Sequence, residues 1–308
     1  MEGCSGYDRE SESTEAATLG QISDIESIVE LPFPSLLAVP RSFQLNEDGF
    51  FKYQGRSDLK SLHDKIVNFW KNDHCVKVDI VGTIGYGKSH MLAVLVLLLL
   101  LKPIYTKYGS TPFVCYIPDF QRILFGEAAV VAILRRNIQL NMSDFSGQIH
   151  TIEDIRAVMR YHKVILVADQ WNSIDGPNTE CIKTWERLRS CFGTSVCVEI
   201  HGMSTNSNPH AVLPKHISQD RIIYNGGFND DEFRVWLQHH RGIFTEHKDE
   251  LALLTGKVPL LLSAFRRVYK EGDSWESVVQ RVQQDAISVK NWLKLLMIFY
   301  ANIDANQV

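Results

Sequence analysis

Residues 82–89 constrain the fold of this chain more than any other segment. They read Gly-Thr-Ile-Gly-Tyr-Gly-Lys-Ser and match G-x-x-x-x-G-K-[ST] in full. A short β-branched run, residues 75–81, precedes them, and an apolar run, residues 89–101, follows. Glycines let such a loop turn so that its backbone N–H groups converge on phosphate oxygens, and the N-terminus of the next helix adds its positive dipole. The order strand, glycine-rich loop, buried helix therefore predicts a phosphate-binding loop.

The residue types of this loop have separate chemical roles. We expect Lys88 to reach the β- and γ-phosphates of a nucleotide and Ser89 to ligate Mg²⁺. The other predicted nucleotide contacts here are Gly82, Thr83, Ile84, Gly85, Tyr86, Gly87 and His90. For His90 the alternative is a ring held by packing or by the loop's hydrogen bonds. A chance octapeptide in a glycine-containing turn is the alternative for the whole loop, and the flanking strand and helix disfavour it.

A magnesium nucleotide also needs a carboxylate at the end of a neighbouring strand. Residues 163–168 form an apolar run, Lys-Val-Ile-Leu-Val-Ala, that ends at Asp169. We assign Asp169 the Walker B role, as the second Mg²⁺ ligand, with an ordinary turn aspartate as the alternative. Position 170 is Gln170, which can orient a water molecule but is a poor base, so binding is better supported than hydrolysis. The predicted catalytic residues are Lys88, Asp169 and Gln170.

Weaker candidates are polar residues that follow predicted strands or lie on predicted helices. Those that could contact the nucleotide or sense its γ-phosphate are Asn172, Asp175, Ser204, Asn206, Arg266 and Arg267. Those that could serve a neighbouring subunit as an arginine finger are Arg187 and Arg189. Turn, loop and surface positions are the alternative for all of them. We interpret Trp171, Trp185 and Trp236 as core or interface residues.

Apolar strands alternate with helical patterns along the chain. Besides the segments that flank the phosphate loop, strands are predicted at 112–117, 163–168, 195–200 and 221–224, and helices at 122–140, 151–161 and 179–191. Such alternation is typical of a parallel sheet covered by helices on both faces, so we predict an α/β P-loop NTPase fold. The later helical patterns cover residues 230–240, 248–254, 259–271 and 274–300 and predict a C-terminal α-helical domain.

The chain of 308 residues is long enough for about two domains. Residues 1–30 are polar and acidic, which predicts a disordered tail. Residues 31–228 are assigned to the P-loop NTPase α/β domain. Its lead-in, residues 31–55, looks ordered but irregular, and it is followed by a helix over residues 57–70 with Ser57 as N-cap. Residues 229–308 are assigned to the helical domain.

Composition limits the partners and the compartment. The net charge of −4 argues against a nucleic-acid partner, although a local basic patch would permit one. The six cysteines form no C-x-x-C pair, which favours a reducing compartment, cytoplasmic or nuclear. The N-terminus lacks the basic and apolar regions of a signal peptide. The apolar run at 91–101 is shorter than the roughly 20 residues of a spanning helix, so we expect no membrane partner.

Two segments outside the phosphate loop carry a family resemblance. Tyr53-Gln-Gly55-Arg56-Ser-Asp-Leu59 resembles the "hhGRExEL" entry of the STAND and origin-recognition branches of AAA+-like ATPases, where it lies against the adenine ring. Leu254-Thr-Gly256-Lys-Val-Pro259-Leu260 resembles the G-x-P motif of the STAND helical domain, whose proline also contacts the nucleotide. The resemblance therefore implies nucleotide contacts for Gly55, Arg56 and Pro259.

Three further stretches narrow the resemblance. VGTIGYGKSHMLA, VCYIPDF and VILVADQWNSID are similar to the P-loop domain of Crinkler effectors and of retrotransposon hot spot proteins, and the likeness covers about residues 45–270. In that group a D-Q-x-N Walker B recurs, which makes Gln170 a family trait. The family implies delivery into a host cell and often its nucleus. Its usual N-terminal header with an LFLAK-type motif, and its frequent C-terminal nuclease or kinase-like domain, are not found in this sequence.

The sequence thus predicts a P-loop NTPase that binds ATP and Mg²⁺ and hydrolyses the ATP. Adenine is the default base because no N-K-x-D element for guanine follows the loop. One alternative is a non-hydrolysing ATP-dependent switch or scaffold, which Gln170 favours. Another is a nucleic-acid-acting NTPase. A kinase for a small substrate is disfavoured by the long helical C-terminal segment. A protein partner or a homo-oligomer is compatible with each of these.

Overall fold

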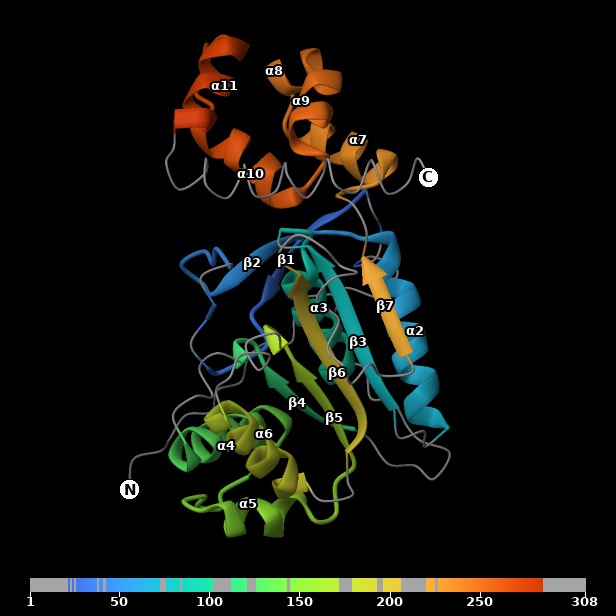
Figure 1. Ribbon diagram of the computed structural model, residues 1–308, viewed down its shortest axis with the longest axis vertical. Helices are drawn as coiled ribbons and strands as arrows, with labels where there is room; N and C mark the ends of the chain where they lie inside the picture. Colours follow the sequence, from blue (N-terminus) through green and yellow to red (C-terminus); the bar gives the residue numbers. More distant parts are fainter. Residues whose placement is uncertain are drawn as a thin grey trace, which may run out of the picture.

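The structure is a computed structural model (Figure 1). It describes residues 22, 24, 26–37, 39–40, 43–72, 76–83, 85–101, 112–120, 126–142, 145–171, 179–192, 196–205, 220–224 and 227–284.

The centre of the molecule is a five-stranded sheet with the order β4-β5-β6-β3-β7. Its strands are β3 (Val76–Thr83), β4 (Phe113–Ile117), β5 (Val164–Ala168), β6 (Val196–Thr205) and β7 (Asp220–Tyr224). Every adjacent pair is parallel. The strand that leads to the phosphate loop, β3, and the strand that ends before Asp169, β5, are therefore separated by β6 alone.

Helices cover both faces of this sheet. Helices α2 (Ser57–Lys71) and α3 (Lys88–Leu101) lie on one face, and α4 (Glu127–Asn141), α5 (Ile152–Met159) and α6 (Thr179–Phe192) lie on the other. Strand residues alternate between the two cores with the period of two that a strand imposes: in β5, Ile165 packs toward α3 and Leu166 toward α4–α6. The predicted α/β fold with helices on both faces is confirmed.

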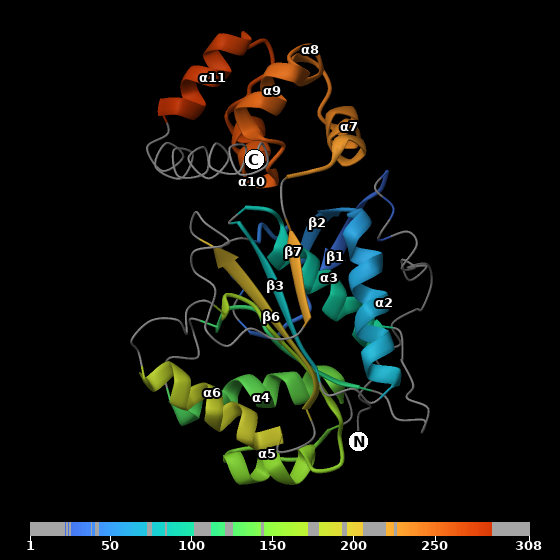
Figure 2. The same ribbon diagram turned by 45° about the vertical axis from the view of Figure 1, so that its right-hand side comes forward.

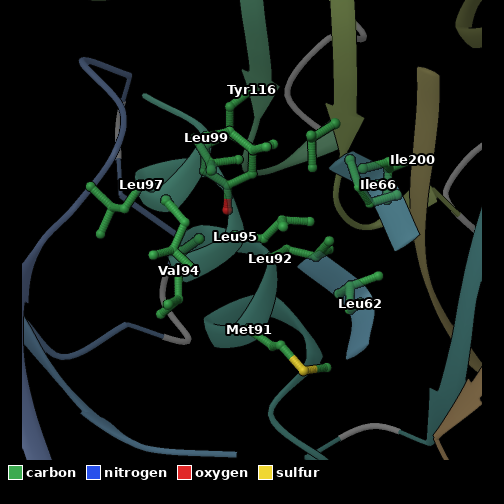
Figure 3. Packing of buried hydrophobic residues seen from close by; sticks show 14 of the residues in the cluster. Leu62, Ile66, Met91, Leu92, Val94, Leu95, Leu97, Leu99, Tyr116 and Ile200 are labelled. Atoms are coloured by element: carbon green, nitrogen blue, oxygen red, sulfur yellow. The ribbon is translucent and has the colours of Figure 1, made fainter. Parts of the chain in front are cut away.

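Helix α3 is apolar all round because it is enclosed on all sides. Its leucines pack with Tyr116 of β4, Ile200 of β6 and Ile66 of α2 (Figure 3). An antiparallel hairpin of β1 (Ile28–Pro32) and β2 (Phe50–Gln54) adds Phe51 and other side chains to the same core. The sequence predicted an irregular lead-in here, and β1 begins inside the segment predicted to be a disordered tail. Residues 1–21 lie outside the described residues.

A separate helical unit follows the sheet. It consists of α7 (Asp230–His239), α8 (Ile243–Glu246), α9 (Lys248–Thr255), α10 (Pro259–Val268) and α11 (Trp275–Gln284), which share their own apolar core. This unit lies beyond the edge at which the strands end (Figures 1 and 2). The predicted boundary at residue 229 falls on Asn229, the N-cap of α7. The predicted helix over 274–300 is described only as far as Gln284.

Two local predictions were wrong. Ser57 is the first helical residue of α2 and Arg56 is its N-cap, because the N–H of Ser57 is satisfied by Glu232 of α7 and not by a local side chain. Strand β6 continues to Thr205, whereas the sequence predicted that this strand ends at Ile200. Parallel pairing with β3 extends the strand, with Ser204 opposite Gly82.

No described helix combines the length and the hydropathy needed to cross a bilayer. The most apolar of them, α3, has 14 residues.

Asparagine amides on α4 satisfy the backbone of β4, which is an edge strand of the sheet. The Asn137 amide accepts from the Tyr116 N–H at 2.8 Å and donates to the Tyr116 carbonyl at 3.2 Å. Asn141, one turn later, makes the same pair of bonds to Val114, each at 2.8 Å. The two side chains therefore act as a substitute strand and protect the edge from pairing with another chain.

Asn137→Ala should lower the free energy of unfolding by about 2 kcal/mol, because it leaves the buried N–H and C=O groups of Tyr116 unsatisfied. Urea denaturation measures this loss. Gln139→Ala, on the exposed face of the same helix, is the control and should change stability by less than about 0.5 kcal/mol. Equal effects of the two substitutions would contradict the edge-protecting role of Asn137.

Candidate functional site

The predicted phosphate loop connects β3 to α3. Gly85 and Gly87 have positive φ values of 91° and 82°. A Cβ atom on Gly85 would also lie 2.8 Å from Cβ of Leu260, so glycine is required there by both the backbone and the available space. Ile84 lies outside the described residues.

The structure brings Lys88, Ser89 and Asp169 together. Lys88 is the first residue of α3 and is buried, and Asp169 directly follows β5. The Ser89 hydroxyl donates a hydrogen bond to the Asp169 carboxylate, and the Lys88 ammonium lies close enough to interact with the same charge. The buried Oδ2 of Asp169 accepts no hydrogen bond within the described part of the chain. A hydroxyl beside a carboxylate oxygen in this arrangement fits the oxygen ligands of Mg²⁺.

Burial dominates the electrostatics of this pair. It raises the pKa of Asp169 to about 6, although hydrogen bonds from Ser89 and the Gln170 N–H and the charge of Lys88 oppose the shift. It lowers the pKa of Lys88 to about 8, and the charge of Asp169 opposes that shift. Each group therefore depends on the other to remain ionised in a site from which water is largely excluded.

The backbone at Gln170 is in a left-handed conformation, with a φ of 61°. Its N–H donates to Asp169 Oδ1 at 2.8 Å. A non-glycine residue in this region costs roughly 1–2 kcal/mol, and such strain is concentrated at functional sites. The sequence identified Gln170 by its position after Asp169, but no local pattern indicated the strain.

Arg56 connects the phosphate loop to the helical unit. Its Nη1 donates to the Tyr86 carbonyl oxygen at 3.4 Å, and its Nε lies 3.2 Å from Oε1 of Glu232. The guanidinium also lies over the Phe228 ring, 5.1 Å from its centroid. Glu232 is almost fully buried and also accepts from the N–H and hydroxyl of Ser57. The contact of Arg56 and Ser57 with Glu232 of α7 was not predicted, because the partners are far apart in the sequence.

The start of α10 lies directly against the loop. Pro259 is the first residue of this helix, and the Leu260 N–H donates to the Gly85 carbonyl oxygen at 3.3 Å. The Tyr86 side chain is buried against Val258 and Leu261. Loop residues that were predicted to contact nucleotide therefore also contact the helical unit.

The other predicted site residues lie in different surroundings. The His90 ring stacks on Phe43 at 4.3 Å, which is the packing alternative. Gly55 is buried beside β1, where its N–H donates to the Ser27 carbonyl. Ser204 lies within β6, next to Gly82 of β3. Asn172, Asp175 and Asn206 lie outside the described residues.

The candidate arginines lie in different settings. Arg189 pairs with Glu199 of the same chain at 3.5 Å, and Arg187 is exposed on α6. Arg266 and Arg267 are exposed in the last turn of α10, about 10 Å along the helix from its start at the loop. These positions do not test the arginine-finger role predicted for Arg187 or Arg189. They also do not test the γ-phosphate-sensor role predicted for Arg266 or Arg267, and both roles stay predictions.

Comparisons with known proteins give a fold relationship. No protein-family model matches the sequence, and no curated protein matches it. The chain is similar in structure to the Aeropyrum pernix ORC2 protein in ADPNP–ADP complexes, with a TM-score of 0.50 and 12% identity over 84% of this chain and 73% of that chain.

Two further solved structures are more distant. They are Drosophila ORC bound to DNA (TM-score 0.43, 11% identity, 87% of this chain and 64% of that chain) and AMPPCP-bound DnaA from Aquifex aeolicus (TM-score 0.43, 15% identity, 74% and 66%). The ORC2 likeness shows that the two chains share a fold. The narrower resemblance to Crinkler and STAND proteins stays a prediction.

Asp169→Asn should change the pH dependence of stability in the absence of nucleotide. The pKa of Asp169 is about 6 in the folded chain and near 3.8 when unfolded, so the folded state binds the extra proton between these values. Stability from this group is therefore lost as pH rises from 4 to 6. Relative to the wild type, Asp169→Asn should gain about 2 kcal/mol over that interval, measured by urea denaturation at each pH. A constant difference from pH 4 to 7 would contradict the raised pKa.

Arg56→Ala and Glu232→Ala should each lower the free energy of unfolding by about 3 kcal/mol, because each leaves a buried charge without its partner. The double variant should lose clearly less than the sum of the two. Arg234→Ala, which removes an exposed pair with Glu26, is the control and should cost less than about 1 kcal/mol. Additive losses for Arg56 and Glu232 would show that they do not act as a pair.

Proposed function

We propose that this protein binds MgATP at the phosphate loop and hydrolyses it. The observation that carries the proposal is the contact between the loop and Asp169, in which the Ser89 hydroxyl donates to the carboxylate beside the buried Lys88. These residues are eighty positions apart in the sequence, and their types are those that a magnesium nucleotide requires.

The chain's own residues have distinct roles in this proposal. The backbone N–H groups of the loop and the Lys88 ammonium bind the phosphates. Ser89 and Asp169 would hold Mg²⁺, which when bound neutralises charge on the β- and γ-phosphate oxygens. Gln170 orients the attacking water molecule toward the γ-phosphate. Gly55, Arg56 and Pro259 are proposed to border the adenine, as the family resemblance implies.

A second candidate is a switch in which ATP binding favours one arrangement of the α/β domain and the helical unit, and in which turnover is slow or absent. The contacts of the helical unit with the loop support it, because the Gly85 carbonyl accepts from the Leu260 N–H and the Tyr86 side chain is buried against Val258 and Leu261. Gln170 in place of a carboxylate base also favours it. The role as an NTPase module of Crinkler-type effectors rests on the motif resemblance, and a nucleic-acid-acting NTPase rests on no described contact.

Lys88→Ala should weaken MgATP binding at least about 10-fold, because it removes a charge-assisted hydrogen bond to phosphate. Asp169→Ala should remove the dependence of binding on Mg²⁺. Titration of a fluorescent ATP analogue, with Mg²⁺ or with EDTA, measures both effects. Lys60→Ala, on the exposed face of α2, is the control and should leave affinity unchanged.

Phosphate release by the same proteins separates the two candidates. Turnover that Lys88→Ala and Asp169→Ala abolish would support the ATPase. Tight binding without turnover in the wild type would support the switch. Unchanged ATP affinity in Lys88→Ala would overturn the site assignment.

A further inference from the structure

A buried polar cluster lies on the face of the sheet opposite α3. It consists of Asp79 on β3 and of Glu199 and His201 on β6, each at most 4% exposed. His201 Nδ1 lies 3.2 Å from Asp79 Oδ1, and its Nε2 lies 2.8 Å from Glu199 Oε1. Because both ring nitrogens are engaged, the imidazole is fixed in its plane and cannot rotate without breaking a buried hydrogen bond.

Charged side chains at the rim complete this cluster. Lys77 of β3 and Arg189 of α6 lie 3.7 and 3.5 Å from the Glu199 carboxylate. Burial alone would raise the pKa of Glu199, but His201, Lys77 and Arg189 together lower it, so this carboxylate is held ionised. The carboxylates bonded to His201 and the cations beside them therefore come from β3, β6 and α6.

The ring of Trp171 lies flat on the ring of His201. Their centroids are 3.7 Å apart and their planes differ by 5°. Phe120 and Trp185 contact the same indole, at centroid distances of 5.0 and 4.4 Å. The indole is therefore fixed by contacts with three aromatic side chains, of which His201 alone is stacked face to face.

Trp171 directly follows Gln170, and the residue before Gln170 is also fixed. The Asp169 N–H donates to the Ile117 carbonyl at 2.9 Å, and the Asp169 carbonyl accepts from the Phe120 N–H at 3.1 Å. Gln170 is thus held between two anchored neighbours in its left-handed conformation. That backbone conformation determines the direction in which the Gln170 side chain leaves the chain.

We propose that His201 is a positioning residue for ATP hydrolysis, which acts through Trp171 to hold Gln170 where it orients the attacking water molecule. This inference rests on the proposed function. It assigns a role to a residue of β6 that lies outside the phosphate loop and outside the Asp169–Gln170 pair. Because water orientation matters only in the transition state, loss of the stack should lower kcat and leave MgATP affinity unchanged.

The test uses Trp171→Leu, which removes the stack but keeps His201 and both carboxylates, and His201→Gln as a second variant. Each should lower kcat by about 10- to 100-fold, with the Kd for MgATP within about twofold of wild type. Trp171→Phe, which keeps an aromatic ring, should recover most of the activity. Ile155→Ala is the control for lost stability, since Ile155 is a fully buried aliphatic residue of the same core on α5.

A double-mutant cycle tests whether the effect passes through Gln170. In a Gln170→Ala background, Trp171→Leu should cause no further loss of kcat. A further loss as large as in the wild type, or an equal loss in Ile155→Ala, would overturn the inference. So would a wild type that binds MgATP without turnover, and this outcome would leave the binding site standing. A wild type that does not bind MgATP would overturn the proposed function itself.

Discussion

The hydrogen bond between the Ser89 hydroxyl and the Asp169 carboxylate forms because β3 and β5 end at the same edge of a parallel sheet. With only β6 between them, the residues that follow these strands are brought within reach of each other. An antiparallel arrangement would send one of them to the opposite edge. The register that pairs Ser204 with Gly82 adds the end of β6 to the same place. The order and direction of the strands alone therefore place the site residues at one edge of the sheet.

This site stores unfavourable free energy that the rest of the domain offsets. A buried ammonium, a buried carboxylate and a left-handed glutamine each oppose folding. The enclosed helix α3 begins at the same loop and buries most of its leucine side chains. At roughly 1.5–3 kcal/mol for each fully buried side chain, this helix supplies the stabilisation that fixes Lys88 and Ser89 in position. The apolar run that is too short to span a membrane is thus the anchor of the polar site.

Local patterns in the sequence were sufficient for the parts of the fold that depend on local chemistry. Phosphate binding requires the glycine spacing of residues 82–89, and a carboxylate at the end of a strand, as at Asp169, suits a magnesium nucleotide. Buried strands and helices likewise impose the periodic apolar patterns seen along the chain. The residues that were missed act across long separations. Glu232 caps a helix that begins 175 residues earlier, and His201 pairs with Asp79 across 122 residues. The sequence around a polar residue in a strand or at a helix start does not indicate such a partner, because the two residues become neighbours only in the folded chain.

The segment of residues 257–260 packs closely against both the entry to the helical unit and the phosphate loop. A Cβ atom on Gly227 would lie 2.1 Å from the Lys257 carbonyl oxygen, and the Phe228 N–H donates to that same oxygen. Three residues later, the Leu260 N–H contacts Gly85. One short segment thus touches both the chain that enters the helical unit and the phosphate loop. A ligand that binds the loop differently in two arrangements would shift their populations through this segment, as differential affinity requires.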